Sequence, residues 1–194
     1  RRRELGKNKP VSTKQNTIHR IVIIGGGPGG YAAALAGRQL GAEVVLIEES
    51  GIGGNAVLTD VVPSKTLIAT AEAAQRVAVA KSLGVNFTVD GKKVDPHIEV
   101  DLSVMNKRLL SLAKSQSSEM RSTLKKEGVR IIAGRGWLDG NHNVVVQPQG
   151  ESETERIEAK TIILAMGAYP RELESSKPDG DRILNWKQLY NLKE

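Results

Sequence analysis

Apolar residues are most regularly arranged between positions 20 and 48. Ile21–Ile24 form a short, uninterrupted apolar run, which is typical of a strand covered on both faces of a sheet. An alanine-rich segment over 29–40 indicates a helix, and a second apolar run over 43–48 indicates another strand. Gly41 is placed to end the helix in a left-handed turn. We therefore expect a strand–helix–strand unit of the kind that builds parallel sheets.

Two longer helices are predicted in the middle of the chain. Pro63 is expected to open the first, because proline is favoured in a first turn, and this helix should run to Gly84. The second is predicted over 102–126, with Asp101 as its N-cap and Gly128 just beyond its end. We expect residues 49–60 to form an irregular, glycine-rich loop and residues 85–100 to be rich in turns.

After residue 128 the pattern changes to short strands separated by turns that contain glycine. We predict a β-meander with strands over 129–134, 137–147 and 153–165, separated by turns at 134–136, 139–141 and 148–150, which leads into a final buried strand over 161–165. The predicted fold class is therefore α/β: a Rossmann-like domain with a parallel sheet, long helices and an inserted β-meander.

The glycines between the first strand and the first helix indicate a phosphate-binding turn. Gly25, Gly27 and Gly30 have the spacing G-x-G-x-x-G, in which the second glycine lets a pyrophosphate approach the backbone. Glu48 ends the second strand, where an acid can accept hydrogen bonds from a ribose. The glycine spacing alone also fits an ordinary turn of an α/β protein, but its place within the whole unit favours a dinucleotide site.

Composition excludes several kinds of chemistry. The 194 residues contain no cysteine, so they can form neither disulfides nor thiolate metal sites, and thiol catalysis is excluded. His19, His97 and His142 are far apart in sequence, and we expect no metal site. No apolar run approaches the length of a transmembrane helix.

The net charge of +6 is concentrated at the N-terminus, where residues 1–20 hold seven basic residues against Glu4 alone. We expect residues 1–17 to form a basic, disordered tail that is solvated or binds an anionic partner. Specific nucleic-acid binding is the weaker hypothesis, because aromatic residues that could stack on bases are scarce. With no secretion signal and an arginine-rich leader, the expected location is the cytoplasm or an organelle matrix or stroma.

Four motifs, in order, resemble those of the flavoprotein disulfide reductases, and of dihydrolipoamide dehydrogenase-like members in particular. They are GGGPGGY, E-x-x-G-x-G-G, V-P-S-K-T and A-x-G-A-x-P, and the resemblance runs from Ile18 to the C-terminus. It implies that the first Rossmann site takes FAD. It also implies that Lys65 is the catalytic candidate, beside the flavin N5 atom. The implied cofactor-binding set is Gly25, Gly27, Pro28, Gly29, Gly30, Glu48, Gly53, Gly54, Lys65, Gly136, Ala165 and Gly167.

The chain departs from this family at its redox centre. The family's two cysteines correspond to Ala56 and Val61, so no dithiol can pass electrons to a disulfide substrate. Met166 replaces the usual threonine of the last motif. No second glycine fingerprint is present, so we expect a tail over 1–17, an FAD-binding domain over 18–175 and a linker over 176–194 toward an absent NAD(P)H-binding domain.

Two functions remain open. Val57–Asp60 resembles a V-L-x-D sequence of NAD(P)H:quinone or diaphorase-type oxidoreductases, which predicts that kind of enzyme when the protein is complete. The alternative is a non-catalytic accessory or structural subunit with an FAD fold. Either function implies partners: the NAD(P)H-binding and interface domains or another subunit, in an oligomer or complex.

Overall fold

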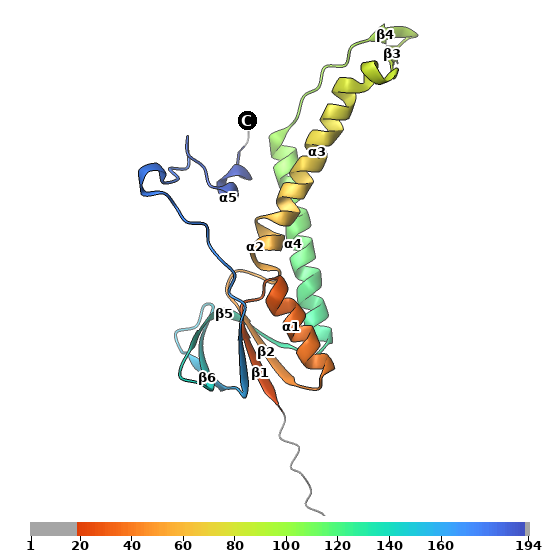
Figure 1. The fold of residues 1–194 in the computed structure, drawn as a ribbon. Coiled ribbons are helices and arrows are strands. Elements are labelled where there is room, and N and C mark those ends of the chain that lie inside the picture. The colour runs from red at the N-terminus through yellow and green to blue at the C-terminus, as the bar shows by residue number, and fades with distance from the viewer. Residues whose placement is uncertain (1–18, 193–194) are drawn as a thin grey trace, which may run out of the picture.

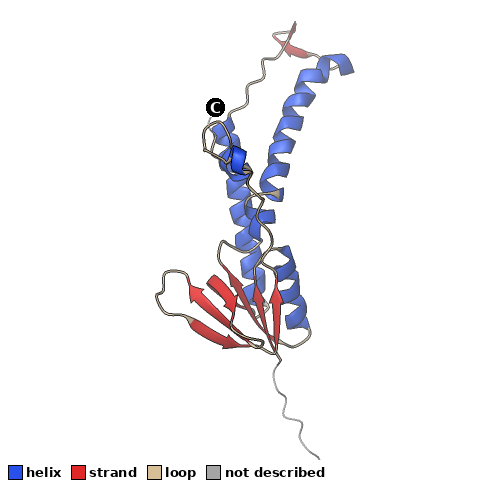
Figure 2. Cartoon of the chain, turned by 60° about the vertical axis from the view of Figure 1, so that its left-hand side comes forward, coloured by secondary structure: helices blue, strands red, loops and turns tan. Residues whose placement is uncertain are grey.

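The computed structural model describes residues 19–192, which fold around a six-stranded mixed sheet (Figures 1 and 2). The strand order across the sheet is β7-β6-β5-β2-β1-β8. Parallel pairing joins β8 (Thr161–Leu164), β1 (Arg20–Ile24), β2 (Glu43–Glu48) and the first half of β5 (Arg130–Leu138). The second half of β5 pairs antiparallel with β6 (Asn143–Pro148), which pairs antiparallel with β7 (Glu155–Glu158).

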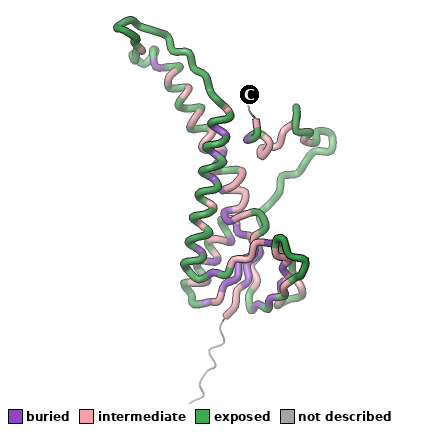
Figure 3. Tube along the Cα trace, turned by 180° about the vertical axis from the view of Figure 1, so that it is seen from behind, coloured by how far each residue is buried: buried purple, intermediate pink, exposed green. Residues whose placement is uncertain are grey.

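Helices cover one face of this sheet and extend beyond it. α1 (Pro28–Gln39) and the C-terminal part of α4 (Leu102–Lys126) pack on the sheet. The rest of α4 and α3 (Val61–Val79) form a largely exposed arm that projects away from it (Figures 1 and 3). The remaining elements are α2 (Gly54–Leu58), η1 (Ala80–Leu83), β3 (Phe87–Val89), β4 (Lys92–Val94), η2 (Glu174–Ser176) and α5 (Trp186–Leu189). No helix within residues 19–192 is long and apolar enough to cross a membrane.

Side chains of the central strands alternate between two hydrophobic cores. Ile23 and Leu46 point toward the helices, where they pack with Leu124 of α4. Val22 and Val45 point the other way, into a core shared with the meander. Successive strand residues face opposite sides of a sheet, so the apolar runs 21–24 and 44–47 supply both cores at once.

The sheet curls because one short connection joins its two edges. β7 and β8 are the edge strands, yet only Ala159 and Lys160 separate them in the chain. Ala159 N donates to His142 O (2.7 Å), and Lys160 N donates to Arg20 O (3.0 Å). The meander is thereby folded back over the inner core.

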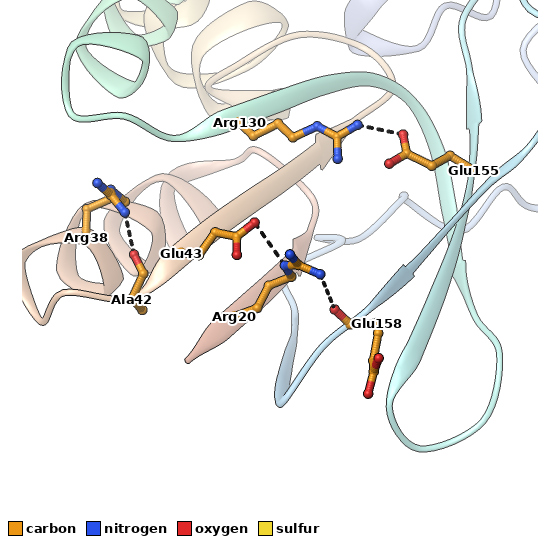
Figure 4. A network of polar contacts seen from close by, with 7 residues as sticks. All are labelled: Arg20, Arg38, Ala42, Glu43, Arg130, Glu155 and Glu158. Atoms are coloured by element: carbon orange, nitrogen blue, oxygen red, sulfur yellow. Dashed lines mark hydrogen bonds and ion pairs between the residues drawn. The ribbon is translucent and has the colours of Figure 1, made fainter. Parts of the chain in front are cut away.

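Exposed polar contacts tie the strands together near the start of β1, away from the glycine turn (Figure 4). Arg20 Nε lies 2.9 Å from Glu43 Oε1 as an ion pair without hydrogen-bond geometry, and Arg20 Nη1 donates to the carbonyl of Glu158 (3.4 Å). Arg130 Nη2 at the start of β5 forms an ion pair with Glu155 Oε2 at the start of β7 (2.7 Å). Exposed pairs of this kind each contribute about 0–1 kcal/mol, so they support the fold without defining it.

The structure confirms the α/β class, and the predictions with strong local signals hold in detail. The second long helix spans Leu102–Lys126 as predicted, and its N-cap Asp101 accepts from Val104 N (3.0 Å). That bond is the main reason the pKa of Asp101 lies below its usual value. Gly41 and Gly128 both adopt left-handed φ angles just past a helix end, at 80° and 77°.

Several predicted boundaries were wrong. β5 passes unbroken through Gly134 and Gly136, where we predicted a break, because both glycines pair with β6. The segment 153–165, predicted to lead into a final buried strand over 161–165, forms two strands at opposite edges of the sheet, and the second of them, β8, is exposed or half-buried along its length. α3 begins at Val61, so Pro63 occupies its third position. The loop predicted over 49–60 contains α2. The tail over 1–17 lies outside the described residues.

Candidate functional site: a groove at the carboxyl ends of the strands

The carboxyl ends of the parallel strands converge on one groove. β1 leads into Gly25, β2 ends at Glu48, and β8 leads into Ala165. Parallel α/β sheets bind ligands at this edge, because the loops and helix N-termini there face an open crevice. Topology therefore brings together three segments that lie far apart in sequence.

Two glycines of the turn after β1 are required by close backbone contact. Gly25 has φ 105°, and a Cβ added to it would lie 2.2 Å from Ala165 O. A Cβ added to Gly30 would lie 1.8 Å from Gly25 O. Only glycine fits at these positions, so the turn, the start of α1 and the segment after β8 are held together at van der Waals distance.

Two other glycines leave the groove open. A Cβ added to Gly27 or Gly29 would meet no atom within 4 Å, and both residues line the groove. Gly27 is the N-cap of α1 and Pro28 follows it, so the first amides of the helix have no intrahelical acceptor. An anionic group can approach this backbone closely and accept hydrogen bonds from it.

Glu48 organises the loops beside the groove. Its Oε2 accepts from Gly26 N (2.5 Å), and its Oε1 accepts from Ser50 N (2.6 Å) and Gly51 N (3.2 Å). Gly53 N in turn donates to Gly26 O (2.8 Å). The carboxylate therefore holds the glycine turn against the loop that leads into α2, while its side chain still borders the groove.

The groove consists of two adjoining cavities. The first, of about 750 Å³, lies between the glycine turn, α2 and the 165–169 segment. The second, of about 560 Å³, lies along 134–138 of β5 and the end of β8. Both are lined by Glu48, Ser50, Met166 and Tyr169. Each has the size of a small-molecule site, and together they suit an extended ligand with two bulky ends.

The walls of the second cavity are apolar and partly uncovered. Trp137, Leu138, Leu164 and Met166 line it with exposed fractions of 44%, 50%, 51% and 63%. Large apolar side chains that remain exposed together commonly mark a ligand site. Gly136 lies among them, and a Cβ there would press on Ile47 at 3.1 Å. This end of the groove is suited to a flat heterocycle.

The structure brings most of the predicted site residues together and leaves three outside the cavity walls. Gly30 is buried beneath the turn, and Gly53 precedes α2 and bonds to the turn through its N–H. Lys65 is exposed on α3 and borders neither cavity. The predicted residues that do line the cavities are Gly25, Gly27, Pro28, Gly29, Glu48, Gly54, Gly136, Ala165 and Gly167.

Of the two positions that correspond to the family's redox cysteines, one lines the first cavity and the other does not. Ala56 belongs to α2 and lines the cavity, whereas Val61 begins α3 and is 41% exposed. Asn55, which precedes Ala56, donates through Nδ2 to Ala168 O (3.3 Å) and so joins α2 to the segment after β8. The wall at Ala56 is thus formed without a sulfur atom.

Sequence reasoning missed Asn55, Tyr169 and Lys187 as groove residues. Lys187 lies on α5, in a segment predicted to be a linker, and reaches the first cavity because the chain returns from β8 toward the helices (Figure 1). No local signal marks such a return. Within residues 19–192, no group of three or more His, Asp or Glu side chains is arranged to hold a metal ion.

The contacts present fit a dinucleotide such as FAD. A glycine cradle and the first amides of α1 suit a pyrophosphate, and Glu48 lines the cavities on either side of that cradle.

A family model described as "Pyridine nucleotide-disulphide oxidoreductase" matches residues 19–193. An NAD(P)H dehydrogenase (quinone) of Mycobacterium tuberculosis is 39% identical over 183 residues, which cover 90% of this chain and 36% of the relative. A dihydrolipoyl dehydrogenase of Zymomonas mobilis is 32% identical over 173 residues, covering 89% of this chain and 35% of the relative.

Solved structures show the same relationship. The crystal structure of LpdA from Mycobacterium tuberculosis superposes with a TM-score of 0.80 at 38% identity, covering 91% of this chain and 38% of that one. RclA from Escherichia coli, a flavoprotein disulfide reductase, shares the fold with a TM-score of 0.69 at 21% identity. The chain thus spans little more than a third of the proteins it matches. It belongs to the pyridine nucleotide-disulphide oxidoreductase family, which is flavin-dependent.

Proposed function

We propose that this chain is the FAD-binding part of an NAD(P)H-dependent oxidoreductase that reduces a non-disulfide acceptor, a quinone or a diaphorase-type dye. One observation carries the proposal: the groove keeps the glycine cradle and Glu48 but has Ala56 where the family has a thiol. The cofactor site is therefore retained while the route to a disulfide substrate is lost.

Each end of the groove receives one part of the cofactor in this assignment. Gly27 and Gly29, with the amides that begin α1, would hold the pyrophosphate. Glu48 would bind the ribose, and Gly136 and the apolar wall of the second cavity would hold the adenine. The first cavity, beside Gly167 and Ala56, would take the isoalloxazine.

When bound, FAD supplies hydride-transfer chemistry, and the protein contributes position and electrostatics. Ala56 presents an apolar surface that excludes water from this wall of the cavity. Lys65 is the proposed cation near the flavin N5 atom, where it would favour negative charge. Its exposed place on α3 requires the side chain to extend back toward the cavity when the site is filled.

The NAD(P)H donor is assigned to protein outside these residues. We propose that residues 18–175 form the FAD-binding domain and that 176–194 link it to an NAD(P)H-binding domain or subunit. The relatives are almost three times as long as the matched region, which supports this arrangement. The quinone acceptor is inferred from the name of the M. tuberculosis relative together with the missing thiols.

The visible absorption spectrum of the purified chain tests the proposal. We expect flavin bands after reconstitution with FAD, and we expect them to bleach with NADH or NADPH only when the donor-binding domains are present. Failure to bind flavin would refute the cofactor assignment. Flavin that stays oxidised even in the complete protein would instead favour the alternative function, a non-catalytic accessory subunit with an FAD fold. The missing thiols are compatible with that alternative too.

A further inference from the structure

Lys187 places a positive charge in the wall of the first cavity. It is half-buried on α5 and lines the cavity together with Gly27 and Gly29. Its Nζ lies 5.4 Å from the ring centroid of Tyr169 and 5.3 Å from that of Trp186. Two aromatic faces within about 6 Å hold an ammonium group in place but use none of its hydrogen-bond donors.

The charge of Lys187 is not balanced by the protein around it. No carboxylate between residues 19 and 192 forms an ion pair with it. Glu48 is the other charged residue of this cavity, and it is engaged with backbone amides. A partly desolvated cation without a counter-charge is unfavourable, so this position favours an anionic ligand.

The segment that carries Lys187 is fixed by a capping box within α5 and by the residues that follow it. Asn185 and Gln188 form a reciprocal capping box that fixes the turn of α5. Tyr190 is only 6% exposed, and Asn106 Nδ2 of α4 donates to Leu192 O (2.7 Å). Lys187 is therefore presented by an ordered part of the molecule, which lowers the entropy lost when it binds a ligand.

We propose that Lys187 is a cofactor-binding residue that contacts the pyrophosphate of the dinucleotide from the side opposite to α1. This inference rests on the proposed FAD site and adds a cation to it. The helix amides and the ammonium group would then neutralise the diphosphate from two directions. The adenosine and the flavin gain nothing from this contact, so its effect belongs to the phosphates alone.

The test compares Lys187→Gln with Lys187→Arg, using Lys107→Gln as the matched control at an exposed lysine of α4. Affinity is measured by titrating the protein with FAD, ADP or riboflavin and following the quenching of its tryptophan fluorescence. Loss of a charge-assisted hydrogen bond costs a factor of about 10 to 100. We expect K187Q to lower the affinities for FAD and ADP by that factor and to leave the affinity for riboflavin unchanged. K187R and K107Q should bind all three ligands with affinities within about threefold of those of wild type.

The outcomes separate this inference from the proposed function. If the wild-type protein binds no FAD, the proposed function fails and the inference fails with it. If wild type binds FAD and K187Q binds it equally well, only the inference is overturned. A lower affinity of K187Q for riboflavin with an unchanged affinity for ADP would also overturn the inference, because Lys187 would then contact the flavin and not the phosphates. Should K187Q not fold, the wild-type protein decides: ADP affinity that does not fall with ionic strength contradicts a phosphate contact.

Discussion

At the scale of single residues, the glycines of the turn after β1 divide into two kinds. At Gly25 and Gly30, neighbouring backbone atoms occupy the space that a side chain would need. At Gly27 and Gly29 that space belongs to the open groove. The G-x-G-x-x-G spacing identifies the turn but does not separate these roles, since both require only that Cβ be absent. The distances to neighbouring backbone atoms distinguish them.

This division predicts opposite behaviour for two alanine variants. Gly30→Ala forces a methyl group into Gly25 O and should lower the free energy of unfolding by about 1–3 kcal/mol, the usual cost of overpacking. Gly29→Ala should unfold near the wild-type midpoint but bind FAD more weakly, because its methyl group projects into the groove. Urea unfolding of both variants and an FAD titration of G29A check this. A stable G30A would contradict the close contact.

Residues identified from the motif and residues identified from the fold differ in kind. Glu48, Gly136 and Ala165 follow from family motifs, and the structure places all three at the groove. Tyr169 and Lys187 carry no motif, and they reach the groove only because the chain folds back after β8. Side chains recruited by a long return have no fixed spacing from the rest of a site, so sequence periodicity cannot reveal them.

At the scale of elements, α4 and the C-terminal segment show what local signals can establish. The cap, apolar stripe and terminal glycine of α4 all act within a few residues, and the helix begins and ends as predicted. The segment over 169–192 has few local signals besides the capping box of α5, and its position depends on contacts with α4 and with the start of α3. Tyr190 is the buried anchor of that segment.

Burial of Tyr190, and secondarily the charge of Asp60, raise the pKa of its hydroxyl above the usual value of 10.0. The folded protein then disfavours the phenolate. The stabilisation from this residue is therefore full below pH 10 and is lost as the pH rises through the folded-state pKa. Tyr190→Phe should remove this sensitivity.

We expect the free energy of unfolding of wild type to fall more steeply between pH 9 and 11 than that of Y190F, measured by urea titration with the fluorescence of the two tryptophans. Both proteins share every other group that titrates in this range, so the comparison isolates Tyr190. Parallel pH profiles would show that Tyr190 is not anchored as described.

At the scale of the whole molecule, the fold is that of a flavoprotein disulfide reductase domain, but the redox centre is not. The curled sheet, the helical cover and the groove persist although both cysteine positions are apolar. Ala56 and Val61 can replace cysteines without disturbing the fold, because the cysteine side chain behaves in packing as a small apolar group.

The absence of thiols predicts how the flavin-loaded chain responds to dithiols and thiol reagents. Excess dihydrolipoamide should leave the flavin absorbance unchanged, and alkylation with iodoacetamide should alter neither the spectrum nor FAD affinity. A cysteine-containing dihydrolipoyl dehydrogenase treated in parallel is the positive control and should be reduced by dihydrolipoamide. Bleaching of this chain by dihydrolipoamide would require a direct route from dithiol to flavin.

Local patterns in the sequence are enough to establish the α/β class, the glycine turn, the long helix over 102–126 and the missing redox thiols. Each depends on residue type, short-range spacing or simple presence. Only the tertiary structure shows that β7 and β8 lie at opposite edges, that the groove has two cavities, and that Lys187 lies at one of them. These features arise where segments distant in sequence meet, and their positions depend on packing energies summed over the whole chain.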